Sequence, residues 1–116
     1  MKTKTLSKKP YKGTKDWYPE EMFERNYLFD IWTKVAKEFG YEEYDTPLIE
    51  DAELYRVKSG EELASNQLYS FLDKGDRDIA LRPEMTPSLA RIVAAKKYEL
   101  RFPLRWFNIG RYYRYE

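Results

Sequence analysis

The feature of this sequence that most constrains its fold is one long amphipathic stretch between Pro19 and Gly40. Pro19 with Glu20 and Glu21 behind it is typical of a helix start, because proline suits the first helical position and early carboxylates favour the positive end of the helix dipole. A lysine at position 37 followed by Gly40 is typical of a helix end. These signals predict a helix of about twenty residues.

Apolar side chains recur every four positions along this helix, and further apolar residues widen the stripe. The repeat consists of Phe23, Tyr27, Ile31, Val35 and Phe39, widened by Met22, Leu28, Trp32 and Ala36. So broad a face predicts two contacts, one with the chain's own core and one with a second copy in a symmetric dimer. Trp32 is the expected interface residue.

The remainder alternates short extended and helical segments. Residues 41–49 are expected to be extended, with Pro47 at an edge, a bulge or a strand end. A short helix over 51–57 and a hairpin of residues 67–72 and 78–82 follow. Thr86 before Pro87 predicts a capped helix start, with the helix running to about residue 98. Residues 105–116 predict two strand segments with a bend at Gly110. The fold class is α+β with a mainly antiparallel sheet.

The chain contains no cysteine and no histidine. This excludes disulfides, thiolate zinc sites and histidine-based catalytic triads. Carboxylates, lysines and arginines remain as the side chains that could take part in a reaction. Arginines without a partner base suit positioning and charge stabilisation, as in phosphoryl and nucleotidyl transfer.

Charge is divided unevenly along the 116 residues, although the net charge is only +1. Residues 1–15 carry six lysines and no acid, and residues 101–116 carry four arginines and one acid. Residues 1–12 predict a flexible basic tail, either merely solvated or in salt-sensitive contact with RNA phosphates. The absence of a long apolar run or a leader pattern predicts a soluble, cytoplasmic protein with no membrane partner.

Three segments in this order and spacing resemble histidyl-tRNA synthetase, a class II aminoacyl-tRNA synthetase. They are residues 12–16 (KGTKD), 81–87 (LRPEMTP) and 113–116 (YRYE). The resemblance covers the amino-terminal part of that catalytic domain, over about residues 11–116. Residues 19–50 resemble motif 1, residues 81–87 resemble the loop that binds the amino group, and residues 105–116 resemble the start of motif 2, with Tyr113 in place of phenylalanine.

The resemblance implies a truncated class II fold and a share in a ligase reaction. Such an enzyme activates histidine with ATP to histidyl-adenylate and charges tRNA(His), as a homodimer whose interface includes Trp32 and Pro47. Mg²⁺ is implied as the companion of ATP, and no metal site is expected in the chain itself. The segments that follow motif 2 in the family are absent, so the 116-residue chain alone is expected to be incomplete as an enzyme.

Two residues are expected at ATP. Arg114 matches the motif 2 arginine, and its planar guanidinium can contact two phosphate oxygens at once, so it is the candidate catalytic clamp on the α-phosphate. Glu116 matches the motif 2 glutamate, which by resemblance lies near the adenine end of ATP; the alternative is a solvated chain end.

The amino-group loop provides the candidate histidine contacts. Glu84 carries a charge that suits an α-ammonium, and Thr86 can add a hydrogen bond or serve chiefly as a helix cap. Arg82 is interpreted as an ion-pair partner that supports the site. Arg111 is expected at the surface or an interface, and Gly13 with the following threonine is expected in the site or the dimer contact.

Two other functions remain open at this point. One is the synthetase-like regulatory subunit of ATP phosphoribosyltransferase, which shares the fold and does not charge tRNA. The other is a non-catalytic dimerisation fragment. The presence of Glu84, Thr86 and Arg114 together favours the ligase.

Overall fold

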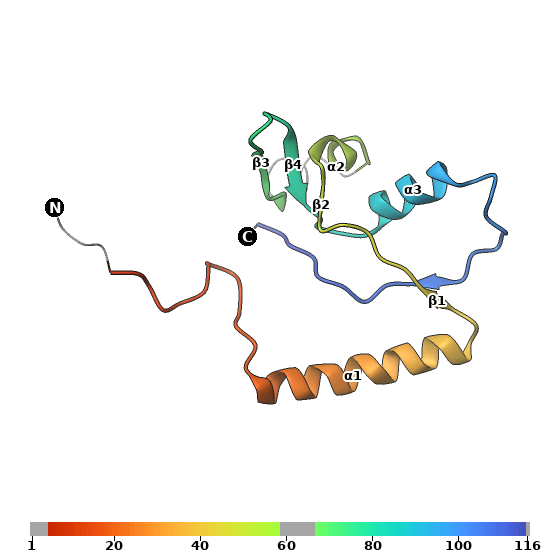
Figure 1. Cartoon of the computed structure of the whole chain (residues 1–116), viewed down its shortest axis with the longest axis horizontal. Coiled ribbons are helices and arrows are strands. Elements are labelled where there is room, and N and C mark those ends of the chain that lie inside the picture. Colours follow the sequence, from red (N-terminus) through yellow and green to blue (C-terminus); the bar gives the residue numbers. More distant parts are fainter. Residues whose placement is uncertain (1–4, 59–66, 116) are drawn as a thin grey trace.

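The computed structural model describes residues 5–58 and 67–115, with the side chains of residues 57 and 58 left out (Figure 1). Its elements are α1 (Pro19–Glu38), β1 (Glu42–Glu43), β2 (Ile49–Asp51), α2 (Ala52–Lys58), β3 (Ser70–Leu72), β4 (Asp78–Leu81), α3 (Thr86–Ala95) and β5 (Trp106–Phe107). They form a three-stranded antiparallel sheet in the order β2-β4-β3 and a two-stranded parallel pair of β1 with β5. The α+β class with a mainly antiparallel sheet is confirmed.

The long helix α1 begins and ends as the sequence predicts. Pro19 lies in its first turn together with Glu20 and Glu21. At its end Gly40 adopts a φ of 81°, which a residue with a Cβ rarely tolerates. The N–H of Gly40 donates to the carbonyl of Lys37 and the N–H of Tyr41 donates to that of Ala36, both at 3.0 Å. This pair of bonds is a Schellman cap, so the glycine closes the helix physically.

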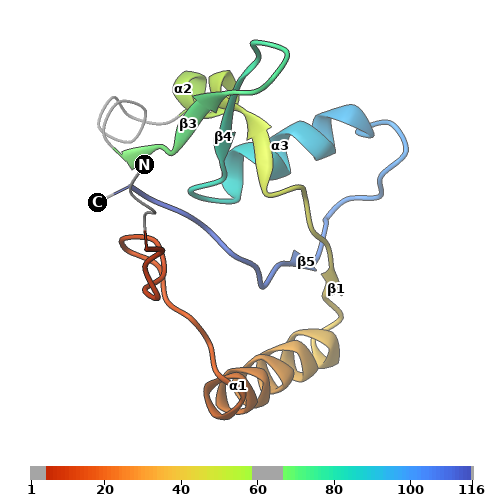
Figure 2. The same ribbon diagram turned by 60° about the vertical axis from the view of Figure 1, so that its left-hand side comes forward.

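The helix α1 stands apart from the three-stranded sheet. Between them lie β1, β5 and the segment after Gly110 (residues 111–115), called the terminal segment below (Figures 1 and 2). None of its residues, all of which the structure describes, is buried. Its inner side carries the half-buried Met22, Phe29 and Ala36. Its outer face, together with Phe39 directly after its end, carries seven large apolar side chains that are 42–75% exposed, namely Phe23, Tyr27, Leu28, Ile31, Trp32, Val35 and Phe39. The predicted packing of α1 against the chain's own core is therefore not observed among the described residues, whose core contains no residue of α1. The predicted contact with a second copy stays a prediction.

The buried core lies between the three-stranded sheet and α2. Ala52, Tyr55 and Ala80 are fully buried, and Leu68 packs with them. The predicted hairpin is confirmed, since β3 and β4 pair antiparallel around a turn in which the Asp73 carboxylate accepts the N–H groups of Gly75 and Arg77. The predicted short helix is confirmed as α2, which packs on β4.

Three local predictions were wrong: one about a helix cap, one about a helix length and one about a number of strands. Thr86 is the first residue of α3 and Met85 occupies the cap position without a side-chain cap bond, so the cap prediction was wrong. The helix ends at Ala95, and the chain continues to Leu100 through hydrogen-bonded turns, so its predicted end near residue 98 was too late. Of the two strands predicted over 105–116, one forms, as the two-residue β5.

The segment after Gly110 is extended but is not part of a regular ladder. Two of its amides nevertheless donate to backbone carbonyls, Tyr113 to Arg82 at 2.9 Å and Tyr115 to Gln67 at 2.8 Å. These bonds connect the segment to the residue after β4 and to the residues before β3. Pro47, expected at an edge, a bulge or a strand end, lies in the loop two residues before β2. The division into a tail (1–12) and a catalytic part (13–116) stays a prediction; the described tail residues, 5–12, contain no helix or strand.

Candidate functional site

Two of the predicted site residues meet, although thirty positions separate them in the sequence. Glu84 lies in the loop between β4 and α3, and Arg114 lies in the extended terminal segment. Nη2 of Arg114 is 3.8 Å from Oε2 of Glu84, which is an ion pair rather than a close hydrogen bond. The two side chains are 47% and 35% exposed, so both remain accessible to a ligand.

Backbone contacts bring these two side chains together. The N–H of Tyr113 donates to the carbonyl of Arg82, one residue before Pro83 and two before Glu84. In an extended segment neighbouring side chains point to opposite sides, so Arg114 is directed away from the rings of Tyr113 and Tyr115. The Tyr115 ring packs edge-on against Tyr69 at 5.3 Å, which anchors the end of the segment.

Buried residues on either side of Glu84 anchor its loop to the rest of the fold. Arg82 is 2% exposed and its Nη1 donates to Asp45 Oδ1 at 2.7 Å. The prediction that Arg82 forms a supporting ion pair is confirmed. Pro83 and Pro87 are also buried, so packed residues flank Glu84 on both sides of the loop.

The other predicted site residues are placed less decisively. Thr86 is exposed at the first position of α3, and its proposed contact with the substrate stays a prediction. Glu116 lies outside the described residues. Trp32, on the outer face of α1, and Pro47 are both exposed, as an interface would require, and their role stays a prediction. Arg111 is exposed, as expected.

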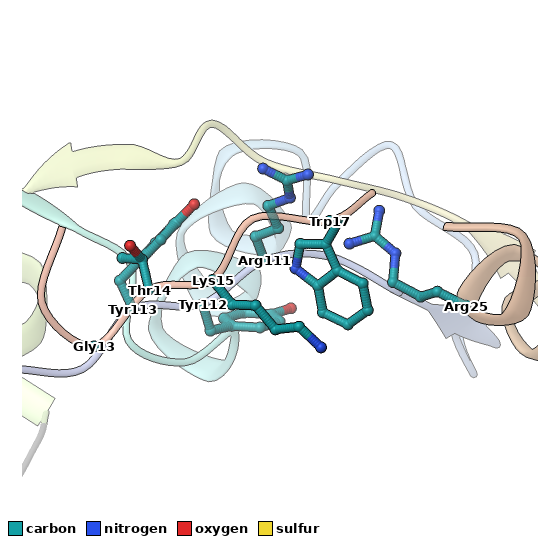
Figure 3. A pocket seen from close by; sticks show the side chains of 8 residues that line it. All are labelled: Gly13, Thr14, Lys15, Trp17, Arg25, Arg111, Tyr112 and Tyr113. Carbon is teal, nitrogen blue, oxygen red and sulfur yellow. The ribbon is translucent and has the colours of Figure 1, made fainter. Parts of the chain in front are cut away.

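A separate cavity of about 390 Å³ lies between residues 13–17, which precede α1, the helix α1 itself and the terminal segment (Figure 3). Gly13 and Thr14 line it, so this turn faces Tyr112 and Tyr113 and not the Glu84–Arg114 pair. Trp17 lies at its centre, with Lys15 Nζ 4.5 Å and the Arg25 guanidinium 4.9 Å from the ring.

Sequence reasoning missed two features of this region. Trp17 and Arg25 were not predicted to meet, because Trp17 precedes α1 and the helical neighbour spacings of three and four positions do not connect it with Arg25. The contacts of Arg82 with Asp45 and with residues near Gly110 join three distant segments, and no local pattern could reveal them.

No helix in the described part of the chain is long and apolar enough to cross a membrane. The described residues also include no group of three or more acidic side chains placed to hold a metal ion.

Comparison with known proteins gives consistent matches. The family model described as Histidyl-tRNA synthetase matches residues 13–116. A relative from Leptospira biflexa, named histidine--tRNA ligase, is 54% identical over all 116 residues, which make up 26% of its own length. The chain thus spans about a quarter of that relative.

Two solved structures share the fold closely. A histidine--tRNA ligase subunit from Alicyclobacillus acidocaldarius is 32% identical, with a TM-score of 0.78 over 97% of this chain and 33% of that one. A structure from Bacillus halodurans, described as an ATP phosphoribosyltransferase regulatory subunit/histidyl-tRNA synthetase, is 29% identical, with a TM-score of 0.85 over 97% of this chain and 29% of that one.

Proposed function

The chain belongs to the histidyl-tRNA synthetase family of class II aminoacyl-tRNA synthetases, and on this premise we propose that it provides part of the site at which histidine is activated by ATP. In the proposed reaction a carboxylate oxygen of histidine attacks the α-phosphorus of ATP. A new O–P bond forms, the bond to pyrophosphate breaks, and histidyl-adenylate results. The longer protein would then transfer the histidyl group to tRNA(His).

The observation that carries this proposal is the contact between Glu84 and Arg114. An amino acid joined to an α-phosphate presents an ammonium and an anionic phosphate within a few ångströms of each other. Glu84 suits the ammonium and Arg114 suits the phosphate. Without ligand the two side chains neutralise each other, and each would exchange its partner for the matching group of the substrate.

Arg114 would act mainly on the transition state. Negative charge grows on the phosphate oxygens as the carboxylate attacks, and a guanidinium already in place stabilises that charge without a proton transfer. Glu84 would bind the ammonium equally before and during the reaction. Its contribution is therefore expected in histidine affinity.

The remaining site assignments complete the proposal. Thr86 is proposed to add a hydrogen bond to the amino group, and Glu116 to lie near the adenine of ATP. Mg²⁺ would enter with the ATP phosphates, since it is usually held by substrate phosphates with one or two carboxylates; we assign it no residue. The cytoplasm is the proposed compartment.

The protein is also proposed to act as a homodimer. The outer face of α1, together with Phe39, exposes seven large apolar side chains, whereas a monomeric surface rarely gathers so many in one patch. A second copy would cover Trp32 there, and Pro47 would lie at the same interface.

A second function has a specific observation in its favour. The Bacillus halodurans structure, whose description includes a regulatory subunit of ATP phosphoribosyltransferase, shares this fold with a TM-score of 0.85. A regulatory subunit of that kind, or a fragment that only dimerises, would keep the fold without activating histidine. These alternatives differ from the ligase in one measurable activity.

That activity is histidine-dependent exchange of pyrophosphate into ATP. Exchange by the 116-residue chain that requires histidine, is not supported by other amino acids and falls at least about tenfold in Arg114→Ala, equivalent to about 1.4 kcal/mol of transition-state stabilisation, would show that these residues suffice for activation and that Arg114 has its proposed role. Arg111→Ala is the matched control, because it removes an exposed arginine three residues away. A folded chain without exchange would contradict independent activation and favour the non-catalytic alternatives.

A further inference from the structure

A buried arginine beneath the proposed site joins segments that are distant in the sequence. Arg82 is 2% exposed and directly follows β4. Its Nη1 donates to Asp45 Oδ1 at 2.7 Å and to the carbonyl of Thr46 at 2.9 Å. Its Nε donates to the carbonyl of Arg111 at 2.9 Å. One side chain therefore connects the loop before β2 with the terminal segment.

Further contacts close this arrangement around the guanidinium. The Tyr112 ring lies 4.9 Å from the Arg82 guanidinium carbon. Asn108 Nδ2 donates to the carbonyl of Tyr44 at 2.8 Å and to Asp45 Oδ1 at 3.2 Å. The hydroxyl of Tyr112 donates to Asn108 Oδ1. The Arg82 hydrogen bond holds the pKa of the Asp45 carboxyl below its usual value, so the pair stays charged near neutral pH.

The space beside the guanidinium fits a glycine. A Cβ added at Gly110 would lie 2.5 Å from Arg82 Nη2 and 3.1 Å from Asn108 Oδ1. The end of a free arginine could move aside, but this one is buried and makes several hydrogen bonds. Gly110 therefore allows the terminal segment to approach Arg82.

The backbone of Arg82 is linked as directly to the proposed site. Its carbonyl accepts the N–H of Tyr113, the residue before Arg114. Along its own chain, Pro83 separates it from Glu84. Arg82 thus contacts both backbone segments that carry the proposed ligand-binding side chains, the loop with Glu84 and the terminal segment with Arg114.

We propose that Arg82 is a positioning residue that sets the separation of Glu84 and Arg114, and that Gly110 is its required neighbour; this inference rests on the proposed function. A lysine would not replace it, because an ammonium lacks the planar fork whose Nε and Nη1 donate in two fixed directions. Arg82 acts through backbone position and contacts no substrate.

The test compares Gly110→Ala and Arg82→Lys with two matched controls. Gly110→Ala changes no charge and displaces the guanidinium, whereas Gly75→Ala adds the same methyl where the nearest atoms are 3.5 Å away. Arg82→Lys keeps the charge but loses the fork, and Arg77→Lys makes the same change at an exposed arginine. All four retain every residue assigned to ligand binding.

Two readouts are needed. The first is hydrogen exchange of the Tyr113 amide by NMR, which requires no activity. We expect exchange at least about tenfold faster in Gly110→Ala and Arg82→Lys than in the parent, with amides of the β3–β4 ladder unchanged. The second is histidine-dependent pyrophosphate exchange. We expect the rate at saturating substrates to fall at least about tenfold while the KM for histidine changes less than about threefold.

Several results would overturn the proposal. Unchanged Tyr113 exchange in both variants would do so, as would full activity in Arg82→Lys, and so would loss of the whole fold in both variants, which would make Arg82 a general stabiliser. If the parent chain shows no pyrophosphate exchange, the proposed function fails, and the amide measurement alone decides whether Arg82 holds the terminal segment in place.

Discussion

Arg114 and Glu84 form an ion pair 3.8 Å long between two segments that have no regular secondary structure at that point. Each is the other's partner in the absence of ligand, and both are partly open to solvent. The pair therefore places opposite charges side by side, as the proposed binding of an aminoacyl phosphate requires.

Glu84→Gln is expected to weaken histidine binding selectively. The amide keeps the size of the side chain but loses the charge that pairs with an ammonium, so the KM for histidine in pyrophosphate exchange should rise at least about tenfold, or about 1.4 kcal/mol. The KM for ATP should change less than about twofold. Glu99→Gln, at an exposed turn after α3, is the control. Equal effects on both substrates would contradict the assignment of Glu84 to the amino group.

Trp32→Glu is expected to convert a dimer into a monomer. A carboxylate on the outer face of α1 would lose its hydration if a second copy covered that face. In sedimentation at a protein concentration of roughly tens of micromolar, we expect the parent chain to behave as a dimer and the variant as a monomer. Asn26→Glu adds the same charge on another side of the helix and should remain dimeric. A monomeric parent would refute the proposed interface.

Stability is expected to fall in acid partly through Asp73. The Arg77 N–H, which donates to this carboxylate, is the main reason that its pKa lies below the usual value, assisted by the Gly75 N–H and the Arg77 side chain. A lowered pKa means that the carboxylate stabilises the fold above the pKa of the unfolded chain, about 3.9, and that this contribution disappears as the pH falls through the lower folded value.

The corresponding variant is Asp73→Asn. It should unfold at lower urea concentration than the parent at pH 7, with a smaller loss of stability between about pH 5 and pH 2. Asp76→Asn, on the same turn, is the control, because asparagine tolerates the φ of 61° found at this position. If Asp73→Asn and the parent lose stability in parallel on acidification, the hydrogen-bonded carboxylate is not the cause.

Tyr55→Phe is expected to lower the free energy of unfolding by about 1–2 kcal/mol. The Tyr55 hydroxyl lies 3.3 Å from Ser88 Oγ, and both residues are fully buried, so removal of one hydroxyl leaves the other without that partner. Urea unfolding should show a lower midpoint with an unchanged slope. Tyr98→Phe, at a position that is 92% exposed, should change stability by less than about 0.5 kcal/mol. Identical midpoints for the two variants would show that this hydrogen bond contributes nothing.

Local signals were sufficient for the elements whose ends are decided within a few residues. The end of α1 depends on Gly40 and the two hydrogen bonds beside it, and the β3–β4 turn depends on Asp73 and Gly75. The cap of α3 was not predictable in this way. Met85 takes the cap position and Thr86 the first helical position, although threonine is the better capping residue, and Pro87 behind them is buried in the fold.

The long helix, the hairpin and the family could be predicted from the sequence, because periodicity, turn residues and motif spacing are properties of neighbouring positions. The sequence also identified Glu84 and Arg114 as candidates. Folding brings these two residues together, places Arg82 in contact with both of their segments and sets Gly110 beside its guanidinium. Those relationships join segments tens of residues apart, and they depend on burial and directional hydrogen bonds that arise only when the chain is folded.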